Sequence, residues 1–112
     1  PYTSSAASDV YKRQLPAPIA GSMFRFVYAG GAADGTDALI ITPGNTNFYI
    51  GGITHLDTNA DNVTVFSNGS SNSSVQLNVP QAFDITIMGL NTTNYQIFGT
   101  VTSTTVPAFA DQ

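Results

Sequence analysis

The stretch FDITIMGLNTTNYQIFGTV, residues 83–101, decides the fold class. In its first half Phe83, Ile85 and Ile87 alternate with polar residues, and its second half repeats this alternation. A period of two places every second side chain on the same face of a strand. Turn-forming residues at 91–94 separate the two halves, so the stretch predicts two antiparallel strands joined by a hairpin connection.

The same pattern recurs along the chain, and no window supports an amphipathic helix of ten residues or more. Strands are expected at 23–29, 38–42, 47–53, 63–66, 75–79, 83–87 and 95–101. About seven short strands at intervals of about ten residues predict an all-β fold, a single antiparallel sandwich or barrel-like domain. The side chains expected to face inward are Phe24, Phe26, Ile41, Tyr49, Val63, Val65, Val75, Leu77, Ile85, Ile87, Ile97 and Val101.

The composition is poor in charge. Charged residues make up 9% of the 112 residues, against a usual share of about a quarter. Residues 15–112 hold one cation, Arg25, and six aspartates, a net charge of 1 − 6 = −5. The polar surface must therefore come from Asn, Ser, Thr and Gln, which suits a protein that packs against copies of itself or a large partner.

These numbers exclude several classes of function. An acidic domain with one arginine lacks the Lys and Arg clusters that bind nucleic acid. The absence of cysteine removes disulfides, thiolate nucleophiles and zinc–thiolate sites. No apolar run approaches the ~20 residues of a membrane span, and no signal peptide is seen. The sequence predicts no nucleic-acid partner, no membrane partner and no cofactor.

Residues 1–14, PYTSSAASDVYKRQ, differ from the rest of the chain and hold two of its three cations. They resemble a translated sequencing adapter, most specifically in the letters DVYKRQ. The alternative is a disordered N-terminal tail. On either interpretation these residues are excluded from the fold prediction. The β-domain then covers residues 15–112, and we expect it to be the C-terminal part of a longer protein.

The sequence offers few residues that could form a catalytic or metal site. His55 is the only histidine, glutamate is absent, and no G-x-S-x-G nucleophile motif occurs, so no enzyme is predicted. Asp57, Asn59 and Asp61 have the spacing with which alternate oxygen ligands surround Ca²⁺. Because the bidentate acid of a calcium loop is missing, a turn rich in turn-forming residues is the favoured interpretation of this segment.

A family resemblance adds a function. The opening segments LPAPIAG (15–21) and MFRFV (23–27), together with YQIFGTV (95–101) and TVPAF (105–109), resemble the two ends of small β-rich structural proteins of tailed phages, many of them marine. Tyr95 stands where a typical member has Trp. The resemblance implies a virion component on the particle surface, a capsid decoration (cement) or head-fibre protein, often trimeric, with itself and capsid or fibre proteins as partners.

Two alternatives stay open. A bacterial extracellular adhesin or surface-layer module shares the neutral, Thr- and Asn-rich β composition. A carbohydrate-binding sandwich would need exposed aromatic rings in a row, and Phe48, Tyr49 and Tyr95 are the candidates. Phe24 and Phe26 alternate with other residues as core-facing side chains do.

Overall fold

A computed structural model of the chain describes residues 10–29, 36–57 and 62–112, and these residues form strands and connections without a helix. The strands are β1 (Val10–Gln14), β2 (Met23–Tyr28), β3 (Asp37–Ile41), β4 (Phe48–Asp57), β5 (Val63–Phe66), β6 (Ser74–Leu77), β7 (Ala82–Gly89), β8 (Asn94–Ser103) and β9 (Ala108–Ala110). The predicted all-β class is confirmed. The described residues therefore include no helix long and apolar enough to cross a membrane.

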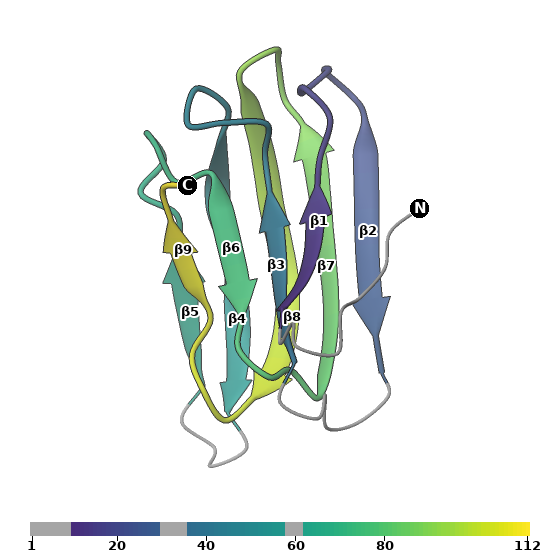
Figure 1. Cartoon of the computed structure of the whole chain (residues 1–112), viewed down its shortest axis with the longest axis vertical. Helices are drawn as coiled ribbons and strands as arrows, with labels where there is room; N and C mark the ends of the chain where they lie inside the picture. Colours follow the sequence, from purple (N-terminus) through teal and green to yellow (C-terminus); the bar gives the residue numbers. More distant parts are fainter. Residues whose placement is uncertain (1–9, 30–35, 58–61) are drawn as a thin grey trace.

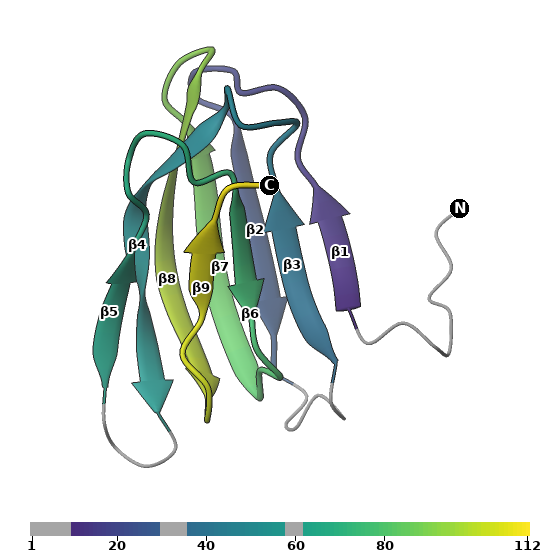
Figure 2. The same cartoon turned by 60° about the vertical axis from the view of Figure 1, so that its left-hand side comes forward.

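The strands form two sheets that pack face to face (Figures 1 and 2). One sheet has four strands in the order β1-β3-β6-β9, and the other has five in the order β2-β7-β8-β4-β5. Both sheets are open, so the described strands form a sandwich and not a closed barrel.

Each of the seven predicted strands is found close to its expected place, and β1 and β9 raise the number to nine. β1 consists of residues 10–14, the end of the segment set aside above, and it pairs with β3. The structure thus places these five residues in a sheet and not in a tail, while their origin as an adapter stays a prediction. Five of the seven pairings between described strands are antiparallel as expected, whereas β1–β3 and β4–β8 are parallel.

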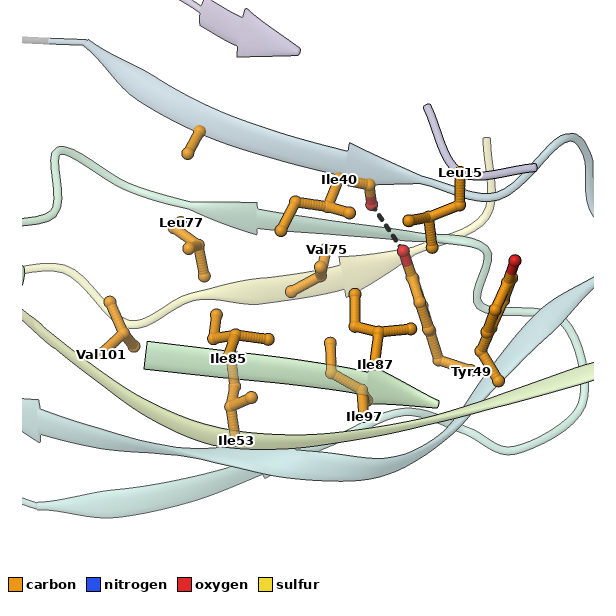
Figure 3. Close-up of a cluster of buried hydrophobic side chains, with 12 residues drawn as sticks. Leu15, Ile40, Tyr49, Ile53, Val75, Leu77, Ile85, Ile87, Ile97 and Val101 are labelled. Carbon is orange, nitrogen blue, oxygen red and sulfur yellow. Dashed lines mark hydrogen bonds between the residues drawn. The ribbon is translucent and has the colours of Figure 1, made fainter. Parts of the chain in front are cut away.

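The hydrophobic core lies between the two sheets (Figure 3). It consists of Leu15, Ala38, Ile40, Tyr49, Ile53, Val75, Leu77, Ile85, Ile87, Tyr95, Ile97 and Val101, with Phe24, Phe26, Phe83 and Phe109 packed against it. Alternate residues of β7 and β8 supply five of these buried side chains. The alternation that predicted the strands therefore also predicted most of the core.

The predicted inward positions need correction in two strands. In β3, Ile40 joins the core because it pairs with Val75, and Ile41 is buried outside the core cluster. In β5, Val63 is 45% exposed and Val65 is half-buried. β5 is an edge strand of the wider sheet, so less of the opposite sheet covers its inward residues.

Two buried tyrosines donate hydrogen bonds to the backbone, one to a strand of the opposite sheet and one to a connection. The Tyr49 hydroxyl donates to the carbonyl oxygen of Ile40 across the sheets at 2.9 Å (Figure 3), and the Tyr95 hydroxyl donates to that of Pro16 at 2.6 Å. Burial away from water raises the pKa of both hydroxyls above the usual value, since the charged phenolate is poorly solvated there. Tyr95 nearby raises the pKa of Tyr49 further.

Candidate functional site: the outer face of the five-stranded sheet

The five-stranded sheet has a second face, which points away from the core. The register places its outward residues in four rows that run across the strands. The aromatic row contains Arg25, Thr86, Phe98, Gly52 and Phe66. The threonine row beside it contains Val27, Asp84, Thr100, Thr54 and Thr64. The two flanking rows contain Met23, Met88, Gln96 and Ile50 on one side and Ala82, Thr102 and Leu56 on the other. We call these residues the outer face.

Large apolar side chains are exposed on the outer face. Their exposed fractions run from 37% for Leu56 to 68% for Phe66. The residues concerned are Met23, Val27, Ile50, Leu56, Phe66 and Phe98. Single exposed apolar residues are ordinary on protein surfaces, so the case for an interaction site rests on six of them sharing one face of one sheet.

The charge of the outer face is confined to one ion pair. Arg25 Nε and Nη2 donate to the two carboxylate oxygens of Asp84 at 2.9 and 2.6 Å, a bidentate contact between β2 and β7. This hydrogen bonding raises the pKa of Arg25 and lowers the pKa of Asp84. Among the outer-face residues these two are the only charged ones, and because they neutralise each other the face carries no net charge.

An open hollow of about 360 Å³ lies around the ion pair, lined by Arg25, Asp84, Thr86, Phe98, Gly99 and Thr100. At the other end of the aromatic row, the Phe66 ring covers Gly52, which has no side chain to compete for the space. The face thus offers apolar rings, hydroxyls and one charged pair, a set of groups typical of protein interfaces.

The sequence-based candidates lie elsewhere. Tyr49 and Tyr95 are buried in the core and Phe48 is half-buried, so these three rings do not form an exposed row. In the calcium candidate, Asn59 and Asp61 lie outside the described residues, and Asp57 ends β4 with its amide donating to Asn62 Oδ1 at 3.1 Å. No group of three potential metal ligands occurs in the part of the chain that the structure describes.

His55 lies inside the sandwich with Ser103, and both side chains are fully buried. His55 Nε2 is 3.0 Å from both the hydroxyl and the carbonyl oxygen of Ser103, and the Ser103 hydroxyl donates to the carbonyl oxygen of Thr105 at 2.7 Å. Because a carbonyl accepts only, Nε2 carries the proton in this arrangement and donates. The Ser103 hydroxyl proton is thus donated to Thr105 and not to His55, and neither side chain of the pair is exposed to solvent.

Phe66 and Phe98 were missed as site residues by the sequence analysis. A signal was present, since Phe98 falls on the polar side of the alternation, between Gln96 and Thr100. The Arg25–Asp84 pair had no such signal, because 59 positions separate the two residues in the chain.

Comparison of the chain with models of known protein families, with curated protein sequences and with solved structures found no match.

Proposed function

We propose that this domain is a structural protein of a phage virion, a capsid decoration or fibre-associated module that works by packing against copies of itself and against other particle subunits. It makes these contacts through apolar side chains and neutral hydrogen-bonding groups, not through charge. No nucleic acid, membrane, cofactor or catalytic residue takes part in the proposed role.

The observation that carries the assembly role is the outer face. A sheet five strands wide leaves six large apolar side chains in solvent, and its one ion pair is internally neutral. Small domains bury a limited fraction of their surface when alone, so contact with further subunits adds burial that a monomer lacks. The location in a phage virion is inferred from the resemblance of residues 15–27 and 95–109 to phage structural proteins.

Co-sedimentation with particles of the phage that encodes the chain tests the proposal. We expect the purified domain to bind the particles and to stay bound when NaCl is raised from low to molar concentration. Charge-driven contacts would weaken over that range, because salt screens charges beyond ~8–10 Å already at physiological ionic strength. A domain that binds no particle at any salt concentration would refute the virion role.

The number of subunits is tested separately by light scattering of the purified domain. The resemblance implies three copies around a three-fold axis. Neighbouring genes offer an independent check, because portal, capsid or tail genes next to this one favour the phage proposal, whereas an exported surface-protein context favours the adhesin alternative.

A further inference from the structure

We infer that the outer face binds the outer face of a second copy, in a two-fold contact in which the Arg25–Asp84 pairs of the two copies meet. The inference deepens the proposed assembly role and rests on it. It names the surface, the partner and the symmetry of one contact between copies.

The size of the outer face fits such a contact. Five strands at a spacing of ~4.8 Å and four rows two residues apart at ~3.4 Å per residue give a face of about 24 Å by 27 Å. The outer-face residues occupy 17 of the 20 positions of this rectangle. Pairing two such faces therefore covers about 550 Å² on each copy, or about 1,100 Å² together, above the about 1,000 Å² that a specific interface needs. The 36 × 35 × 22 Å dimensions of the chain accommodate a face of this size.

The register predicts how two faces fit. A two-fold axis that runs across the strands, between the aromatic row and the threonine row, places each strand against its own copy. Phe98 then lies opposite Thr100 of the second copy, and Phe66 lies opposite Thr64. Large side chains in one row thus meet smaller ones in the other, which is the interdigitation that close packing between sheets requires.

The flanking rows also meet each other. The axis places Ile50 of one copy opposite Leu56 of the other, an apolar pair from β4, and Met88 opposite Ala82, a large residue against a small one from β7. No row of one copy faces the same row of the second copy. A single two-fold operation thus sets large side chains against smaller ones at Phe98, Phe66 and Met88, and apolar against apolar at Ile50.

Charge complementarity identifies a second copy as the occupant. Arg25 belongs to the aromatic row and Asp84 to the threonine row, on adjacent strands. The same axis brings Arg25 of each copy beside Asp84 of the other, so that four charges alternate in sign. A partner that is strongly acidic or strongly basic would instead leave one member of each pair facing a like charge, which is costly at an interface.

Analytical ultracentrifugation of the purified domain at about 100 µM tests the pairing, since interfaces near the lower size limit are weak. We expect dimers, or hexamers if a three-fold contact also forms through other surfaces. Phe98→Lys places a charge in the centre of the contact and should weaken pairing by about 30-fold or more. Ile19→Lys is the matched control: Ile19 is more exposed than Phe98 but lies outside the outer face, so pairing should persist.

A charge exchange tests the position of the ion pair. Arg25→Asp gives a face with two aspartates and Asp84→Arg a face with two arginines, so each variant alone should be monomeric. Mixed in equal amounts, the two variants should form a mixed dimer, because each arginine then meets an aspartate of the other copy. Both substitutions are at exposed positions, and circular dichroism verifies that each variant folds.

Several results would overturn the pairing. These are a wild-type monomer, an odd-numbered assembly, an assembly that Phe98→Lys leaves intact, and charge variants that do not combine. A monomer that binds a glycan through Phe98 would assign the face to a ligand instead. The pairing test needs no phage particle, so the two proposals can fail separately. A dimer that binds no particle would refute only the virion role. A monomer that binds the particle would refute only the pairing of two outer faces.

Discussion

The two faces of the five-stranded sheet come from alternate residues of the same strands, yet they differ in what covers them. Ile97 and Phe98 are neighbours in β8. Ile97 lies in the core under the four-stranded sheet, whereas Phe98 points outward and is 44% exposed. The comparison teaches that apolar character alone does not say what a residue does in this domain. A covered apolar residue stabilises the fold, and an uncovered one is available to a partner.

The largest effect is expected from the inner face. Ile97→Ala removes a fully buried side chain and leaves a cavity between the sheets, so the free energy of unfolding should fall by about 2–5 kcal/mol. Urea denaturation measures the loss. The matched control on the outer face is Val27→Ala, which should change the free energy by no more than about 0.5 kcal/mol. Equal losses for the two variants would contradict the division into a covered and an uncovered face.

A smaller effect is expected where the inner face is polar. Tyr49→Phe keeps the ring but removes the hydroxyl that donates to the Ile40 carbonyl, so one buried hydrogen bond between the sheets is lost. The free energy of unfolding should fall by about 0.5–1.5 kcal/mol, measured by urea denaturation at neutral pH. An unchanged midpoint would mean that the bond between the sheets contributes nothing to stability.

Alkaline pH should weaken the inner face selectively. Burial raises the pKa of Tyr49 and Tyr95 in the folded state above their ordinary value of 10.0. The associated stability is therefore fully present below pH 10 and is lost as the pH rises above it, because the unfolded chain releases these protons first. The loss should reach at most about 1.4 kcal/mol per pH unit for each tyrosine.

Denaturation series at pH 8 to about 11.5 measure this dependence. The double variant Tyr49→Phe/Tyr95→Phe should start from a lower stability but lose less of it as the pH rises. If the double variant loses as much as the wild type, other groups cause the alkaline effect.

The smallest effect is expected for Phe98→Thr. The substitution places a residue of good strand propensity at an exposed strand position, so the stability of the isolated monomer should change by no more than about 0.5 kcal/mol. The measurement belongs at low protein concentration, where association does not add to apparent stability. A loss comparable to that of Ile97→Ala would show that Phe98 contributes to the fold itself.

The prediction from sequence was strongest where alternation is regular. In the stretch 83–101 it placed both strands, the turn between them and four of the residues that the structure buries in the core. It was weakest where apolar residues are adjacent. In the run Ala-Leu-Ile-Ile of β3, either alternate set of residues could face the core. The structure places Ile40 and not Ile41 in the core cluster.

The amino-acid sequence by itself determined the all-β class, the approximate position of seven strands and the poverty in charge, because all three follow from local periodicity and composition. Only the tertiary structure decided which strands are neighbours, including the parallel β4–β8 pairing, and which sheet face stays uncovered. Pairing depends on contacts between residues far apart in the chain, such as Arg25 and Asp84. Alternation shows that a strand has two faces, but only the packing of the second sheet determines which of them is buried.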